Sequence, residues 1–179
     1  MLYKVFNNQE YRLGLFQENV EMVVYTLVSF FVSFFIGHPQ FIVGTIVNCA
    51  LILGALNVRS YKLLPIIIAP SLGVFARGLL FGPFTIFLLY MIPFIWVGNL
   101  IILYVFKLNK NKFIALPVGA LAKAGFLFIA AYALFSFGLV PKVFLFAMGA
   151  VQLATAFSGG LVAIGIQKVK NQPIKSLFT

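Results

Sequence analysis

The sequence contains few of the side chains on which metal sites, disulfides and redox centres depend. It has one cysteine, one histidine and three acidic residues (Glu10, Glu18 and Glu21). The single Cys49 excludes an internal disulfide, a CxxC metal site and an iron–sulfur cluster. One histidine without acidic neighbours, His38, makes a poor metal site, so we expect no bound metal.

Groups for catalysis are also scarce. The chain has no Walker A motif, no nucleophile elbow and no HExxH motif, and it has no carboxylate within an apolar run apart from Glu21 near the start of the first. Without a candidate acid–base pair, we expect neither an enzyme nor a cofactor. Proton-driven carriers generally rely on intramembrane Asp, Glu or His. Self-sufficient proton-coupled transport is therefore not expected.

The composition is instead that of an integral membrane protein. Of the 179 residues, 63% are hydrophobic and 9% are charged, and the mean hydropathy is +1.09. Soluble domains are about half apolar and about a quarter charged. The net charge of +10 comes from basic residues in short segments beside apolar runs. Since no basic face with interleaved aromatic residues exists outside those runs, we expect no nucleic-acid partner.

Six apolar runs are about as long as a helix that crosses a bilayer, which takes about 20 residues. They cover residues 20–37, 40–58, 62–80, 84–106, 113–139 and 142–166. The third is the least regular, because Pro65 and Pro70 would kink it or make part of it re-entrant. We therefore predict an all-α membrane protein with six transmembrane helices in one bundle over residues 19–170. Residues 1–18 would form an interfacial arm and residues 171–179 a cytoplasmic tail.

The distribution of basic residues predicts the orientation. With the N-terminus inside, the cytoplasmic segments hold ten basic residues: Lys4, Arg12, Arg59, Lys62, Lys107, Lys110, Lys112, Lys168, Lys170 and Lys175. The outer segments hold only Arg77 and Lys142. This bias places both termini in the cytoplasm, which agrees with an even number of spans. We expect a multi-pass protein of a bacterial plasma membrane.

Several polar side chains interrupt the apolar runs. Lys123 lies eleven residues from Lys112, and Asn48 lies eight residues from the outer end of its run, or roughly 12 Å deep. Gln152 lies roughly 15 Å deep, and Asn99 lies nearer the cytoplasm. An unpaired lysine at mid-bilayer costs about 2.5 to 3.5 kcal/mol. Lys123 must therefore meet amides, carbonyls, water or an anionic ligand, or extend to the cytoplasmic interface.

Packing offers a second explanation for the amides. Asn48, Gln152 and Asn99 would then join helices, as interhelical amide bonds commonly do. For Asn99 we expect helix bridging. Arg77 would be a charge in contact with solvent or headgroups, if it does not bind a ligand.

Small residues recur every four positions on two runs. Ser29, Ser33 and Gly37 form one ridge, and Ala150, Ala154 and Ser158 form another. Such ridges allow helices to approach closely. They would pack within the chain or provide a docking surface for a partner membrane subunit.

Four stretches resemble one family of membrane proteins. They are "QFIVGTIVNCALILGAL", "APSLGVFARGLLFGP", "MIPFIWVGNLIILYVF" and "VQLATAFSGGLVA", within residues 40–165. They are similar to the S-component-like proteins of energy-coupling factor (ECF) transporters. The resemblance implies a subunit that captures a small, vitamin-like molecule from outside and releases it inside, with a transmembrane coupling subunit and two ATPase subunits as partners.

The resemblance also implies roles for particular residues. Ser29 and Ser33 take the place of the Ala-x-x-x-Ala ridge through which S components dock on the coupling subunit. The ligand would lie in the outer half of the bundle, in a region that includes Gln40, Asn48, Arg77, Lys123 and Gln152. A cationic, amide-lined pocket favours a ligand with a carboxylate or phosphate, on whose ring Trp96 and Tyr132 could stack. The alternative is a small structural or accessory subunit of a larger membrane complex, with no ligand of its own.

Overall fold

The computed structural model describes residues 14–36, 38–81 and 85–171, and these form helices without any strand. The long helices are α2 (Leu15–Phe31), α3 (Gln40–Asn57), α4 (Leu64–Phe81), α5 (Thr85–Leu108), α6 (Lys112–Ser136) and α8 (Gln152–Lys170). A π-helical segment, η1 (Val32–Ile36), continues α2, and a 3₁₀ turn, η2 (Ser60–Leu63), precedes α4. The short α7 (Val143–Phe146) and the π-helical η3 (Ala147–Val151) lead directly into α8.

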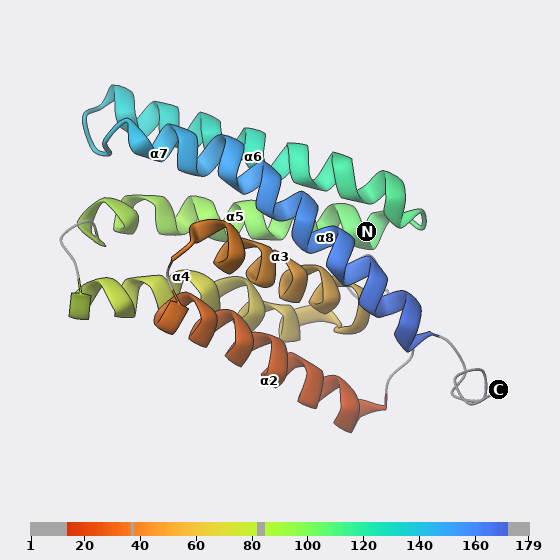
Figure 1. The fold of residues 1–179 in the computed structure, drawn as a ribbon. Coiled ribbons are helices and arrows are strands. Elements are labelled where there is room, and N and C mark those ends of the chain that lie inside the picture. Colours follow the sequence, from red (N-terminus) through yellow and green to blue (C-terminus); the bar gives the residue numbers. More distant parts are fainter. Residues whose placement is uncertain (1–13, 37, 82–84, 172–179) are drawn as a thin grey trace.

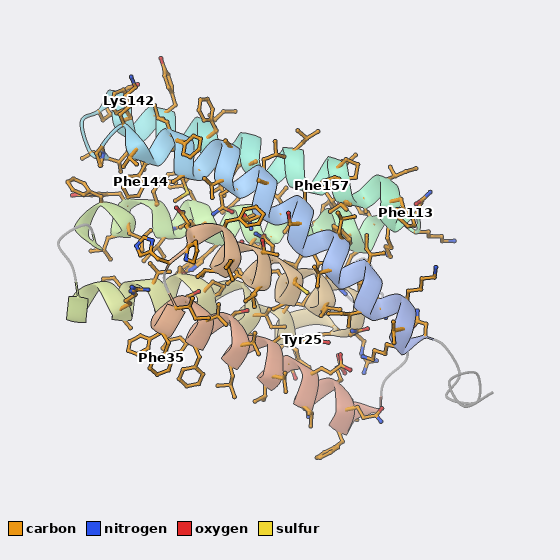
Figure 2. All side chains as sticks on the ribbon, viewed as in Figure 1. Tyr25, Phe35, Phe113, Lys142, Phe144 and Phe157 are labelled. Atoms are coloured by element: carbon orange, nitrogen blue, oxygen red, sulfur yellow. The ribbon has the colours of Figure 1, made fainter. Side chains whose placement is uncertain are left out.

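Five of these segments are long and apolar enough to cross a membrane. They are Leu15–Ile36, Gln40–Asn57, Phe87–Leu108, Lys112–Ser136 and Val143–Lys170. Together they indicate a multi-pass membrane protein. Large apolar side chains also point outward, with Phe35 and Phe113 69% and 73% exposed (Figure 2). Soluble monomers rarely expose extensive apolar surface, whereas lipid would cover it.

Proline does not interrupt the third apolar run. Helix α4 continues through Pro70, and Pro65 occupies its first turn, where a missing N–H leaves no intrahelical bond unmade. Pro93 and Pro117 likewise lie inside α5 and α6. Transmembrane helices tolerate proline because neighbouring groups satisfy the carbonyls that it leaves free.

The helices alternate in direction, so the basic residues at their ends collect at one end of the bundle (Figure 1). We call this the basic end, and it carries Arg59, Lys62, Lys107, Lys110, Lys112, Lys168 and Lys170. Helix α2 begins there and α8 ends there, since Glu21 of α2 forms an ion pair with Lys170 of α8. Helix α2 begins at Leu15. Residues 15–18, which the sequence analysis assigns to the arm, therefore belong to the first helix, while residues 1–13 and 172–179 lie outside the described part.

Helix α3 forms the centre of the bundle, with every residue from Val47 to Asn57 buried. It packs closely on α8 because glycine lies at the crossing. A Cβ atom on Gly159 would come within 2.4 Å of the Thr45 carbonyl oxygen, and one on Gly44 within 2.8 Å of the Thr155 side chain. This close contact brings polar groups of α3 and α8 together in the interior of the bundle.

Candidate functional site

Lys123 lies on the buried face of α6, in the middle of the helix. It is only 2% exposed, and its Nζ donates a hydrogen bond to Oδ1 of Asn48 on α3 at 2.6 Å. A lysine ammonium carries three N–H donors, of which Asn48 accepts one. The side chain therefore points into the bundle and does not extend to the membrane surface.

The Asn48 side chain has an orientation fixed by its other contacts. Its Nδ2 donates to the Gly44 carbonyl at 2.8 Å and to Oγ1 of Thr155 at 3.3 Å. An ammonium can only donate, so the oxygen of the amide must face Lys123. Both donors of Asn48 are thus engaged on one side and its acceptor faces the cation on the other.

Thr155 completes this group, although it is not among the residues predicted from the sequence. It is 1% exposed on α8, and its Oγ1 donates to the Gln152 carbonyl at 3.2 Å. The available sequence signal was a hydroxyl residue one helical turn after Gln152 in an apolar run. We refer to Lys123, Asn48 and Thr155 as the Lys123 cluster.

The π-helical segment η3 (Ala147–Val151) ends directly before Gln152. Such segments insert an extra residue into a helical turn and are frequent at functional sites. Here the wide turn ends one residue before Gln152 and four residues before Thr155. The cluster therefore lies beside an irregular part of the helix.

The other predicted ligand residues are placed less centrally. The Gln152 side chain is half-buried, and only its backbone carbonyl bonds to the cluster. Gln40 is exposed at the start of α3, about 12 Å along the helix from Asn48. Arg77 is partly buried on α4, and its buried Nη1 has no hydrogen-bond partner within the described part of the chain. The structure thus joins Lys123 to Asn48 directly, but no hydrogen bond between described residues links Gln40 or Arg77 to them.

The ridge of Ser29 and Ser33 faces the interior of the bundle. These residues are 0% and 1% exposed, and a Cβ atom on Gly73 of α4 would lie 3.0 Å from the Ser33 Cβ. Helix α4 covers this ridge, so the docking role expected for Ser29 and Ser33 stays a prediction, one that requires α4 to move away. Gly37, the third residue of this ridge, lies outside the described residues. In the second ridge, Ala150 and Ala154 are exposed.

Asn99 connects two helices, which is the role the sequence analysis gives it. It is 2% exposed on α5, and its Nδ2 donates to the Ile67 carbonyl of α4 at 3.0 Å. Trp96, one turn earlier, donates from Nε1 to Oγ of Ser71 at 2.6 Å. Both bonds hold α5 against α4 close to Pro70, which lacks the N–H for one helical hydrogen bond although the helix continues.

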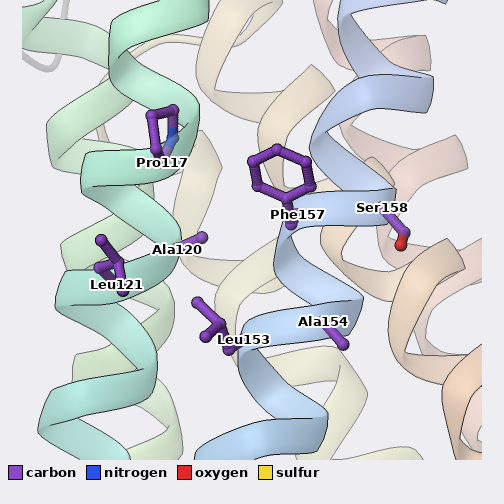
Figure 3. Close-up of a pocket in the computed structure, with 7 residues that line it drawn as sticks. All are labelled: Pro117, Ala120, Leu121, Leu153, Ala154, Phe157 and Ser158. Atoms are coloured by element: carbon purple, nitrogen blue, oxygen red, sulfur yellow. The ribbon is translucent and has the colours of Figure 1, made fainter.

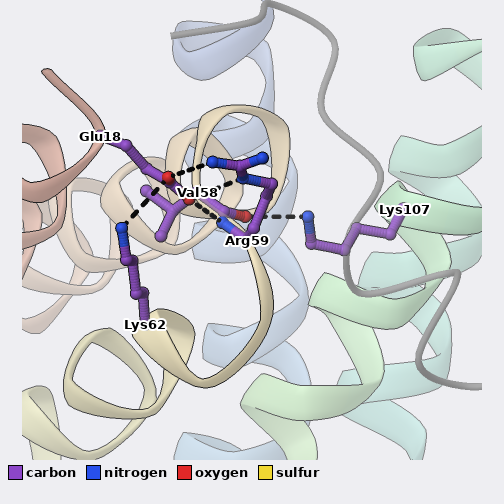
Figure 4. Close-up of polar contacts among 5 residues, drawn as sticks. All are labelled: Glu18, Val58, Arg59, Lys62 and Lys107. Carbon is purple, nitrogen blue, oxygen red and sulfur yellow. Dashed lines mark hydrogen bonds and ion pairs between the residues drawn. The ribbon is translucent and has the colours of Figure 1, made fainter. Parts of the chain in front are cut away.

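A second polar group lies at the basic end (Figure 4). Glu18 of α2 is fully buried and accepts hydrogen bonds from Arg59 through its backbone N–H (2.8 Å), Nε (3.3 Å) and Nη2 (2.9 Å). Lys62 Nζ adds a fourth at 3.2 Å. The hydrogen bond with Glu18 raises the pKa of the Arg59 guanidinium, which stays charged. We call these three residues the Glu18 cluster.

The same connection between α3 and α4 is held from its other side. Lys107 of α5 is 4% exposed, and its Nζ donates to the Val58 carbonyl at 2.9 Å (Figure 4). The loop is thus fixed by a carboxylate of α2 and an ammonium of α5. This site was not predicted from the sequence, in which Glu18 falls within the expected arm and Lys107 within an expected loop.

A chain of hydrogen bonds also ties α2, α3 and α8 together at the basic end. Glu21 accepts from Lys170 and, at 2.8 Å, from the Tyr25 hydroxyl. Asn57 Nδ2 donates to Tyr25 at 3.4 Å, and Gln167 Nε2 donates to Asn57 Oδ1 at 3.0 Å. This chain and the Glu18 cluster together make the basic end the more fully bonded end of the described bundle.

Apolar core separates the basic end from the Lys123 cluster. Between Asn48 and Asn57, about 13 Å apart along α3, every side chain is apolar and buried. The two polar groups are therefore distinct.

In comparisons with known proteins, no family model, no curated protein and no solved structure matches the chain.

Proposed function

We propose that this chain is the substrate-binding membrane subunit of an ECF-type transporter, and that Lys123 binds the acidic group of its ligand. The ligand would be a small, vitamin-like molecule with a carboxylate or phosphate. Under this proposal the basic end is cytoplasmic, as the excess of lysine and arginine there favours. Uptake would require a coupling subunit and two ATPase subunits.

The buried ammonium of Lys123 is the observation that carries the proposal. Its described partner, Asn48, is a neutral amide that leaves the positive charge uncompensated. Glu18 and Glu21 lie at the basic end and are bonded to other cations. A lysine at mid-membrane depth costs about 2.5 to 3.5 kcal/mol and generally marks a substrate, ion or proton site. An acidic ligand group would neutralise the charge of Lys123 and accept hydrogen bonds from its remaining N–H groups.

The distribution of polar atoms supports entry from the end opposite the basic end. Thr45 lies one turn from Asn48 in that direction, and its buried Oγ1 lacks a hydrogen-bond partner in the described chain, as does Nη1 of Arg77. Toward the basic end, by contrast, the interior is apolar. A polar ligand would therefore meet available donors and acceptors from the outer side.

One observation favours the alternative of an accessory subunit. Lys123 and Asn48 are 2% and 1% exposed, and α3 and α8 are in close contact through Gly44 and Gly159. A ligand could reach the ammonium only after a helix moves. In an accessory subunit the cluster would serve only to fix the packing of α3, α6 and α8.

The substitution Lys123→Met separates the two functions, because methionine has a similar length without the charge. Removing an uncompensated lysine from mid-membrane saves about 2.5 to 3.5 kcal/mol, which offsets the cost of about 1 to 3 kcal/mol for leaving the Asn48 oxygen without its hydrogen bond. We expect the variant to fold, to lose the acidic small molecule that copurifies with the wild type in native mass spectrometry, and to lose uptake. Lys142→Met, at an exposed residue near the opposite end, should change neither.

The partner is tested by copurification of the tagged wild type from membranes. An ATPase-linked coupling subunit is the expected companion. If the Lys123→Met protein carries the same ligand in the same amount, the proposed binding role of Lys123 is wrong. If no ligand accompanies the wild type and Lys123→Met releases a different membrane subunit, the accessory function is correct.

A further inference from the structure

An open groove lies on an exposed face of the bundle, lined by residues of α6 and α8 (Figure 3). Its volume is about 520 Å³, and Pro117 and Leu121 of α6 form one wall while Leu153, Ala154 and Phe157 of α8 form the other. Ala120, Ala154 and Ser158 are the lining residues with small side chains. This volume is within the range of about 300 to 1,000 Å³ that small-molecule sites occupy. We call it the α6–α8 groove.

The groove is aligned with a cation at the basic end. Phe157, Leu161 and Lys168 follow one another at intervals of four and seven residues, so they lie on one face of α8. All three are exposed. Lys168 is eleven residues from Phe157, or roughly 16 Å along the helix. That distance is close to half the thickness of a hydrocarbon core of about 30 Å.

A second exposed cation lies beside the other wall. Lys110 is in the connection between α5 and α6, seven residues before Pro117. The carboxylates described at this end do not neutralise these two lysines, because Glu18 bonds to Arg59 and Lys62 and Glu21 bonds to Lys170. The two lysines thus place positive charge at the basic end, while the groove provides an apolar interior farther along the same face of α8.

We propose that the α6–α8 groove binds one anionic phospholipid from the leaflet at the basic end. Its headgroup contacts Lys168, and one acyl chain extends from there along the exposed face of α8, past Leu161 and into the groove between Phe157 and Leu153. The charge of the two lysines selects an anionic headgroup, since each basic residue near the surface attracts anionic lipid. The apolar walls accommodate the part of the chain that lies near the middle of the membrane. This site is separate from the Lys123 cluster and does not depend on the proposed transport function.

The test is a lipid titration of the detergent-purified, delipidated full chain, followed by native mass spectrometry. We expect phosphatidylglycerol to bind more tightly than phosphatidylcholine with the same acyl chains. Lys168→Gln should weaken the binding of phosphatidylglycerol by about fivefold and leave phosphatidylcholine unchanged. Ala154→Phe fills the groove and should weaken the binding of both lipids.

Two matched controls accompany these variants. Lys142→Gln removes an exposed lysine near the opposite end, and Val162→Phe adds a phenyl group at an exposed position of α8 outside the groove. Neither should change lipid binding. Since Lys168 is exposed, its variant is expected to fold and to give a result even if Ala154→Phe does not.

Three results would overturn the proposal. One is equal binding of phosphatidylglycerol by Lys168→Gln and the wild type. Another is binding of glycerol phosphate as tight as that of the whole lipid, which would mean that the headgroup alone is recognised. The third is a wild-type dimer that Ala154→Phe converts to a monomer, which would show that a second copy of the chain occupies the groove.

Discussion

Replacing Glu18 with glutamine tests whether a buried charge attaches α2 to the connection between α3 and α4. Glu18 is fully buried and accepts four hydrogen bonds from Arg59 and Lys62. Glutamine keeps one oxygen, which can still accept from the Arg59 backbone N–H. It loses the negative charge and the second oxygen, which Arg59 Nη2 and Lys62 Nζ now share.

The expected loss can be estimated from the exposure of the partners. Removing one member of a fully buried ion pair costs about 3 to 5 kcal/mol. Here the side chains of Arg59 and Lys62 are 37% and 15% exposed, so both cations can regain contact with water. Exposed pairs contribute only about 0 to 1 kcal/mol. We therefore expect Glu18→Gln to lower the free energy of unfolding by about 2 kcal/mol.

The matched control is Glu21→Gln on the same helix. Glu21 and its partner Lys170 have side chains that are 19% and 27% exposed, and a glutamine can still accept the bond from Tyr25. We expect a loss below about 1 kcal/mol. Both variants are measured by unfolding in mixed micelles with increasing dodecyl sulfate, followed by circular dichroism. A Glu21→Gln loss equal to or larger than that of Glu18→Gln would refute the reasoning, because burial would not then decide the strength of the contact.

Two further substitutions probe the helix contacts with the same assay. Gly159→Ala should lower the free energy of unfolding by about 1 to 3 kcal/mol, since its Cβ would meet backbone atoms of α3 at Thr45 and Cys49. Its control, Gly165→Ala, has nothing within 4 Å of its Cβ and should stabilise the protein by up to about 1 kcal/mol. Equal effects of the two substitutions would contradict the α3–α8 contact. Asn99→Leu should cost about 0.6 to 2 kcal/mol by removing the bond to α4, and an unchanged stability would mean that this bond contributes nothing.

The sequence predicted the helices well because length and hydropathy are local properties. Five of the six apolar runs coincide with helices able to cross a membrane. The start of α2 was placed too late, because Glu18 and its neighbours look like an interfacial arm when their partners are unknown. In the bundle, the charge of Glu18 is neutralised by Arg59, a residue 41 positions away.

Spacing alone could not predict which face of a helix is covered. Ser29 and Ser33 have the spacing of a docking ridge, and so do Ala150 and Ala154. The structure covers the first pair with α4 and leaves the second pair exposed. Periodicity identifies a ridge but carries no information about the helix that packs on it.

The sequence by itself determined that this chain is helical and suited to a membrane, with a lysine midway along an apolar run, because apolar length follows from composition and position. Only the tertiary structure decided what that lysine meets. Lys123 and Asn48 are 75 residues apart in the chain, and Thr155 joins them from a third helix. Their meeting depends on the close α3–α8 contact at Gly44 and Gly159 and on the orientation of the Asn48 amide. These are properties of packed helices, which no single segment of the sequence contains.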